Sequence, residues 1–93
     1  MAVASAPSIP DSDLIPASVI YPKTRNETFT VKPNPDHRWY FKNAQQPNEV
    51  MLIKCFDSDT SVARRAPHCA FRDAEMDNRE DRESIEVRSL IFY

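Results

Sequence analysis

The sequence contains no glycine, although proline occurs eight times. Glycine provides the positive φ angles and the close backbone approach that tight turns and phosphate-binding loops require. Its absence excludes a phosphate-binding loop, and it excludes the sharp turn that carries the nucleophile in many hydrolases. Compact β domains use glycine in their turns. We therefore expect long loops here, or strands that complete their pairing with another segment.

An excess of positive charge is also missing. Twelve lysine and arginine residues stand against 14 aspartate and glutamate residues, so the net charge is −2. Arg64 and Arg65 form the only pair of adjacent Lys/Arg residues. Nucleic acids and anionic membranes attract extended basic surfaces. We therefore expect neither of them as a partner.

Long apolar runs are absent as well. No stretch of the sequence approaches the roughly 20 apolar residues that a membrane-spanning helix needs. The first residues, MAVASAPSIP, lack the basic and apolar regions of a secretory signal. These features predict a soluble, cytoplasmic protein.

Cysteine is scarce, occurring only at Cys55 and Cys69. This spacing fits no zinc-binding pattern. Thiols of cytoplasmic proteins stay reduced, so two free, buried thiols are favoured over a disulfide.

The residues that are present predict a mainly β fold with about five strands and little helix. Residues 49–56 (EVMLIKCF) are apolar almost throughout, which is typical of a strand buried on both faces. Residues 83–93 alternate between apolar and charged side chains, and this is the clearest strand pattern of the sequence. The other predicted strands cover residues 28–32, 37–42 and 66–71.

The predicted strands belong to one unit, residues 14–93, preceded by a flexible lead-in at residues 1–13. The aromatic side chains of Trp39, Tyr40 and Phe41 are expected in the core, with the wall of a pocket as the alternative. Five strands leave unpaired edges, which invite aggregation unless they are covered or closed into a barrel or jelly roll. We therefore expect further β structure beside this chain.

His68 is the first candidate for chemistry. It lies within APHCAF, so its imidazole would sit in a fairly dry strand. A neutral imidazole is a good ligand for Fe(II) and forms part of the two-histidine, one-carboxylate triad. The alternative is a buried structural histidine that is hydrogen-bonded and inert.

Arg82 and Ser84 are the second candidates, because residues i and i+2 of a strand share one face. A guanidinium offers two parallel donors to a carboxylate, and the hydroxyl adds a third. The pair suits the distal carboxylate of a 2-oxo acid, and a hairpin between residues 66–71 and 83–93 would bring it near His68. The alternative is a solvated strand entry. Arg88 would point to the same face of the strand as Arg82, but it lies further along the strand, which favours a structural role.

Lys54 and His37 are two further titratable residues. Lys54 lies in the apolar run 49–56, and a lysine in such surroundings must pair or lose its charge. We therefore expect a carboxylate partner, for which Asp57 lies close in sequence, and a Schiff-base role is the alternative. His37 lies beside the turn at residues 33–36 and is expected to face solvent.

Five blocks of sequence carry a resemblance to a known family. They are LIP at residues 14–16, HRWY at 37–40, PNEVMLIKCFDS at 47–58, PHCAF at 67–71 and RESIEVR at 82–88. In this order they resemble the C-terminal third of a fungal hydroxylase/desaturase family of secondary-metabolite gene clusters. The resemblance covers nearly the whole chain, from about Ile9 to Tyr93.

The resemblance implies a double-stranded β-helix, or jelly roll, that uses non-haem Fe(II) and 2-oxoglutarate. In that scheme His68 resembles the distal iron-binding histidine, and Arg82 and Ser84 resemble the clamp for 2-oxoglutarate. The implied reaction couples oxidative decarboxylation of 2-oxoglutarate to hydrogen abstraction from a small-molecule natural product, which is hydroxylated or desaturated.

Family members carry an earlier His-x-Asp pair that supplies the other two iron ligands, and these 93 residues contain no such pair. One histidine does not hold a catalytic iron by itself. We therefore expect a truncated gene product, a chain whose barrel is completed by another chain, or one that has lost catalysis. The competing function is a non-catalytic β domain that binds a partner protein or a metabolite.

Overall fold

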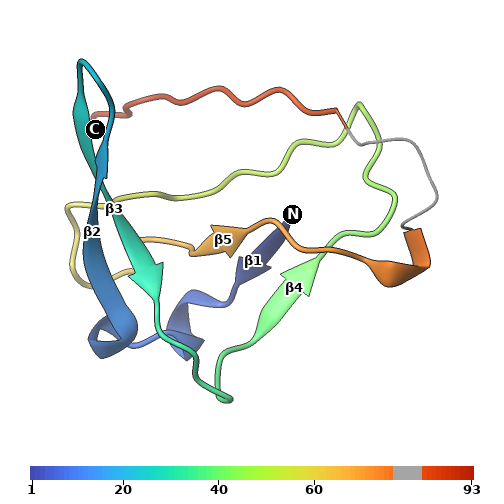
Figure 1. Ribbon diagram of the computed structural model, residues 1–93, viewed down its shortest axis with the longest axis horizontal. Helices are drawn as coiled ribbons and strands as arrows, with labels where there is room; N and C mark the ends of the chain where they lie inside the picture. Colours follow the sequence, from blue (N-terminus) through green and yellow to red (C-terminus); the bar gives the residue numbers. More distant parts are fainter. Residues whose placement is uncertain (77–82) are drawn as a thin grey trace.

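The fold consists of two small antiparallel sheets joined by irregular segments (Figure 1). The structure is a computed structural model that describes residues 1–76 and 83–93. Within these residues, no helix has the length and the apolar character needed to cross a membrane. The strands are β1 (Ala2–Ala4), β2 (Leu14–Ile20), β3 (Arg25–Val31), β4 (Trp39–Phe41) and β5 (His68–Cys69), and the 3-10 helices are η1 (Ala6–Ser8), η2 (Asp11–Asp13) and η3 (Ala74–Met76). The prediction of a mainly β chain with about five strands is confirmed, whereas closure into a jelly roll stays a prediction.

Strands β2 and β3 form a regular hairpin. Their register runs from Leu14 opposite Val31 to Ile20 opposite Arg25. The connecting turn is closed by the Tyr21 N–H, which donates to the Thr24 carbonyl at 2.8 Å. β3 contains most of the predicted strand 28–32. The sequence did not predict β2, because Pro16 and Pro22 interrupt its apolar pattern.

The second sheet has the strand order β4-β1-β5, with β1 at its centre. The predicted strands 37–42 and 66–71 are confirmed in shortened form as β4 and β5. Residues 1–13, predicted as a flexible lead-in, contain the central strand and two 3-10 helices. The unit boundary at residue 14 stays a prediction.

Two predicted strands are not formed. Residues 49–56 and 83–93 run as extended segments without ladder pairing (Figure 1). In the first segment Met51 and Ile53 are half-buried, whereas the side chain of Leu52 is 91% exposed. The prediction of burial on both faces is therefore wrong. A β-strand needs a neighbouring strand to satisfy its backbone groups in a regular ladder. Neither segment has such a ladder among the described residues, although the Lys54 carbonyl accepts from the Ala66 N–H at 2.8 Å.

The core is very small for a chain of this length. Ala2, Ala4 and Ile9 are the only buried apolar residues that the described part of the chain contains. The accessible surface is 8722 Å², whereas a compact protein of 10.7 kDa exposes about 5,500 Å². The radius of gyration is 15.3 Å, against about 12 Å for a compact domain of 93 residues. The chain therefore exposes about 3,200 Å² more than a compact domain would.

Several side chains expected in the interior lie on this exposed surface. Trp39, Tyr40 and Phe41 are all exposed, so their placement in the core is wrong. Cys55 and Cys69 are free thiols, as predicted, but both are exposed rather than buried.

Candidate functional site

The register of the three-stranded sheet brings His68 and Tyr40 to one face. Val3 of the central strand lies opposite Tyr40 on one side and opposite His68 on the other. Directly opposed residues of antiparallel strands share a face. Tyr40 and His68 are therefore separated by two strand spacings, about 10 Å. A ligand held at His68 would lie within reach of the Tyr40 hydroxyl.

The opposite face of the same sheet carries a different set of side chains. Strand alternation places Trp39 and Phe41 on the side away from Tyr40. The ring of Phe41 contacts that of Phe71, with 4.8 Å between the centroids. Cys69 lies opposite Ala2 and so shares this second face. The two faces of the sheet therefore differ, one carrying His68 and Tyr40 and the other carrying Trp39, Phe41 and Cys69.

His68 is exposed at the start of β5, so the prediction of a dry strand environment is wrong. Its Nδ1 lies 3.1 Å from the carbonyl oxygen of Ala66. A carbonyl oxygen only accepts, so Nδ1 carries the hydrogen and Nε2 of the neutral ring keeps its lone pair. Metal-binding histidines are commonly oriented in this way by a backbone carbonyl. The local geometry of His68 is therefore compatible with a metal ligand.

The described residues do not form an iron site by themselves. No group of three or more His, Cys, Asp or Glu side chains within residues 1–76 and 83–93 is arranged to hold a metal ion. Non-haem Fe(II) in this class of enzyme needs two histidines and one carboxylate. His68 supplies one of these ligands, so the described part of the chain does not fit a complete iron centre.

The predicted carboxylate clamp is only partly described. Arg82 lies outside the described residues, and Ser84 is exposed. The predicted hairpin is wrong, since β5 pairs with β1 and residues 83–93 form no strand. Arg88 contacts Glu86 at 3.1 Å, and both side chains are largely exposed. The roles of Arg82 and Ser84 stay predictions.

Lys54 has the expected carboxylate partner. Its Nζ lies 2.6 Å from Oδ2 of Asp57, and Oδ1 of Asp57 also accepts from the Tyr93 hydroxyl at 3.4 Å. The hydrogen bond to Asp57 raises the pKa of Lys54, and the same bond lowers the pKa of Asp57. An amine with a raised pKa stays protonated and lacks the lone pair that a Schiff base requires. In this ion pair the Lys54 side chain is exposed, whereas that of Asp57 is only 11% exposed.

A cluster around His37 was not predicted from the sequence. Its Nε2 lies 2.8 Å from Oδ2 of Asp13, and Nδ2 of Asn34 donates to the same oxygen at 2.8 Å. The His37 side chain is only 4% exposed, so the prediction that it faces solvent is wrong. Asp13 and His37 are 24 residues apart in sequence, and only the fold brings them together. The turn-forming run PNPD before His37 was the one local signal.

Comparison with known proteins identifies relatives of the whole chain. Residues 1–92 match the model of a family described as an oxidoreductase/YMDC permease-like domain. The hydroxylase/desaturase efuI of Hormonema carpetanum is 38% identical over 105 aligned residues, covering 100% of this chain and 35% of the relative. The alpha-ketoglutarate-dependent dioxygenase tstK of Talaromyces stipitatus is 34% identical over 97 residues, with the same two coverages.

A third relative is more distant. The gibberellin cluster GA4 desaturase of Gibberella fujikuroi is 33% identical over 73 residues, covering 73% of this chain and 21% of the relative. The chain thus spans about a third of the length of the curated relatives efuI and tstK. No solved structure matches it.

Proposed function

The chain belongs to the family described as an oxidoreductase/YMDC permease-like domain, and from this membership we propose that it forms part of a hydroxylase or desaturase of fungal secondary metabolism. Its curated relatives are fungal hydroxylase/desaturases and 2-oxoglutarate-dependent dioxygenases. The proposed enzyme depends on Fe(II) and 2-oxoglutarate and oxidises a small-molecule natural product. Two relatives support the choice of co-substrate by their names: the alpha-ketoglutarate-dependent dioxygenase tstK and the Fe(II)/2-oxoglutarate-dependent dioxygenase nvfI of Aspergillus novofumigatus.

In this proposal His68 contributes one iron ligand through Nε2, and Arg82 and Ser84 bind the distal carboxylate of 2-oxoglutarate. The remaining iron ligands come from a further β segment or from another chain that completes the barrel. The observation that carries the proposal is the position of the exposed His68 on an edge strand, with Nδ1 held by a backbone carbonyl. An unpaired edge can accept a further strand.

The large exposed surface supports the need for a complement. The excess of about 3,200 Å² over a compact domain exceeds what one partner contributes to a standard protein interface, about 800 Å². Residues 49–56 and 83–93 are already extended. They can therefore pair with added strands without changing their general backbone conformation.

The proposal is tested in a chimera in which this chain replaces the matching third of the Hormonema hydroxylase/desaturase. Anaerobic Co(II) titration measures metal binding, and succinate formation with Fe(II) measures turnover of 2-oxoglutarate. We expect His68→Ala to abolish both signals. Ser84→Ala should raise the KM for 2-oxoglutarate about tenfold while Co(II) binding persists, because it removes one hydrogen bond to a charged group.

Cys69→Ser is the matched control, because Cys69 follows His68 in β5 and shares the opposite face of the sheet. This variant should behave like the parent chimera in both assays. Tight Co(II) binding by a folded His68→Ala chimera would overturn the assignment of the metal ligand. A folded parent chimera that binds neither Co(II) nor 2-oxoglutarate would overturn the proposed function itself.

A further inference from the structure

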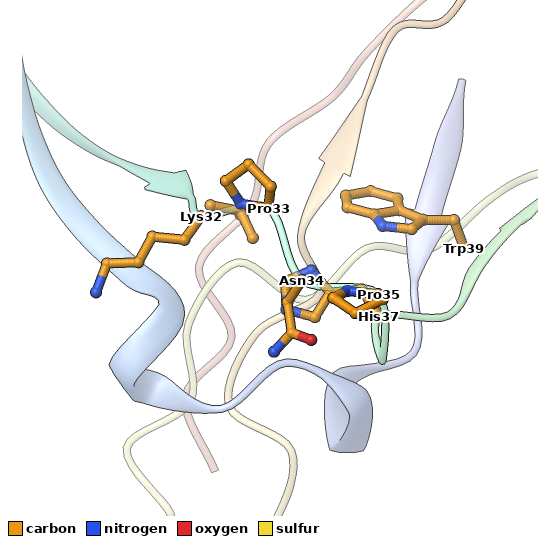
Figure 2. A pocket seen from close by; sticks show the side chains of 7 residues that line it. Lys32, Pro33, Asn34, Pro35, His37 and Trp39 are labelled. Atoms are coloured by element: carbon orange, nitrogen blue, oxygen red, sulfur yellow. The ribbon is translucent and has the colours of Figure 1, made fainter.

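A pocket of about 450 Å³ lies between the end of β3 and the start of β4 (Figure 2). Trp39 forms one side, and Pro33 and Pro35 of the connecting turn lie near it. Val31 adds a further apolar surface. Trp39 shares the face of the three-stranded sheet that points away from His68. The proposed iron ligand therefore does not account for this pocket.

His37 is the polar group built into the pocket wall. Its ring is fixed by the Asp13 carboxylate, which also accepts a hydrogen bond from Asn34. These bonds, that of Asn34 first, lower the pKa of Asp13. The carboxylate is therefore ionised at neutral pH and can only accept hydrogen bonds. Nε2 of His37 must then carry the hydrogen, and in the neutral form of the ring Nδ1 is the acceptor.

Nδ1 of His37 is free to act on a ligand. Among the described residues it has no hydrogen-bond partner. Among the described residues that are not exposed, every side-chain nitrogen or oxygen that is fully buried has a hydrogen-bond partner. Nδ1 of His37 has none, so it is not fully buried and solvent reaches it. His37 lines the pocket and has little other exposed surface. The accessible edge of the ring therefore faces the pocket.

We propose that this pocket binds an apolar small molecule through a hydroxyl group that donates to Nδ1 of His37. The walls of Trp39 and the two prolines match an apolar ring, and the oriented acceptor of His37 matches one O–H donor. Binding pockets for small molecules typically combine such apolar walls with a few fixed polar groups. The site recognises the hydroxyl without assistance from iron, so this proposal can be tested independently of the proposed oxidation chemistry.

The surroundings of the pocket disfavour anions and metal ions. Nζ of Lys32 donates to the Ser12 carbonyl at 2.8 Å, and Figure 2 shows this side chain extending away from Trp39. The ionised Asp13 behind His37 repels a negatively charged ligand. A metal ion would find no cluster of three ligand side chains among the described residues. A neutral molecule that donates a hydrogen bond remains the best chemical match.

The test uses the fluorescence of Trp39, which is the single tryptophan of the 93-residue chain. The chain is titrated with cyclohexanol and, separately, with cyclohexyl methyl ether, which keeps the apolar ring but has no O–H donor. We expect a saturable change in Trp39 emission with cyclohexanol and about fivefold weaker binding of the ether, the ratio that one neutral hydrogen bond provides. Equal binding of the two probes, or no saturable change with either, would overturn the proposal.

A His37→Phe variant separates recognition from folding. It keeps a planar ring in the wall but removes the acceptor, and circular dichroism checks that the β structure persists. The variant should lose the preference for cyclohexanol over the ether. If it misfolds, 15N NMR of the histidine ring in the unaltered chain replaces it, because cyclohexanol should shift the Nδ1 resonance of His37 and leave that of His68 unchanged. A folded variant that keeps the preference, or an unchanged Nδ1 resonance at saturation, would overturn the role of His37.

Discussion

The packed and the unpaired parts of this chain differ less in composition than in what lies beside them. The packed part contains both sheets and the 3-10 helices η1 and η2, and it includes every buried apolar residue of the described chain. The unpaired part consists of residues 49–56 and 83–93, in which apolar residues make up more than half of the sequence but are mostly exposed. Local sequence thus favours extended backbone in both parts. Only the availability of a neighbouring strand decides which segments become sheet.

This contrast also explains why the two parts are expected to serve different purposes. In the packed part, hydrogen bonds such as those of Asp13 fix side chains in one geometry. In the unpaired part, alternating apolar side chains such as Ile85 and Val87 remain uncovered. Exposed apolar surface of this extent marks an interface. The packed part therefore offers a preformed pocket, whereas the unpaired part offers a surface for a complement.

The largest difference between the two parts is expected for substitutions of single apolar side chains. Ile9 is 8% exposed and is the largest of the three buried apolar residues of the described chain. Ile9→Ala should lower the free energy of unfolding by about 2 to 4 kcal/mol, because it removes buried methyl groups and leaves a cavity. The matched change Leu52→Ala, in the unpaired part, should stay within about 0.5 kcal/mol. Urea denaturation followed by Trp39 fluorescence measures both, and equal losses would contradict the division into two parts.

Hydrogen exchange sharpens the same comparison without mutation. In the isolated chain, amides of β2 and β3 should be protected by their ladder, whereas residues 83–93 should exchange as an unstructured peptide does. In the chimera with the Hormonema relative, residues 83–93 should become protected because strands from the complement pair with them. Mass spectrometry of peptic fragments follows both states. Protection of this segment in the isolated chain would mean that it already has a partner.

The sequence predicted strands well where a partner lies in the same sheet. β4 and β5 fall within predicted ranges in shortened form, and β3 overlaps the predicted strand 28–32 but begins three residues earlier. Residues 83–93 have the clearest alternation but form no strand. Alternation indicates which side chains would share a face of a sheet, and it does not indicate whether another strand lies beside the segment. β1 was missed because three small residues carry no periodic signal. It became the central strand through backbone pairing on both of its edges.

The candidate site was predictable to a similar extent. The block around His68 indicated a ligand position on a strand, and the structure adds the orienting carbonyl of Ala66 and the neighbouring Tyr40. The Asp13–His37 pair could not be inferred, since its partners are distant in sequence and belong to different elements. Long-range pairing of polar side chains depends on the tertiary fold, which local patterns do not specify.

Acid titration distinguishes the two parts through their carboxylates. The pKa of Asp13 lies below its ordinary value of 3.8, chiefly because Asn34 and His37 hydrogen-bond to it. A carboxyl group whose pKa is lower in the folded state binds fewer protons there, so its stabilisation is complete above the unfolded pKa and is lost as pH falls through the folded value. Asp13→Asn should therefore weaken the chain at neutral pH and make the decline of stability below about pH 4 shallower.

Asp57 provides the matched control for this titration. Its pKa is also lowered, first by the hydrogen bond to Lys54, but the pair lies in and beside the unpaired run 49–56. Asp57→Asn should leave both the neutral stability and the acid limb of the β2–β3 hairpin nearly unchanged. Circular dichroism between pH 2 and pH 7 measures each curve. A larger loss for Asp57→Asn than for Asp13→Asn would reverse the assignment of the two parts.

The smallest expected effect comes from two surface arginines that differ in what they connect. Arg65 contacts Asp11 at 2.5 Å, and its guanidinium lies 5.1 Å from the centre of the Phe29 ring, so it ties the segment before β5 to η2 and β3. Arg88 forms an ion pair with Glu86, its neighbour two residues away in an exposed segment. Arg65→Ala should cost about 1 kcal/mol through the lost ring contact and ion pair. Arg88→Ala should leave the urea midpoint unchanged, because an exposed pair within one segment connects nothing that unfolding separates. Equal midpoints for the two variants would mean that Arg65 does not connect the sheets in solution.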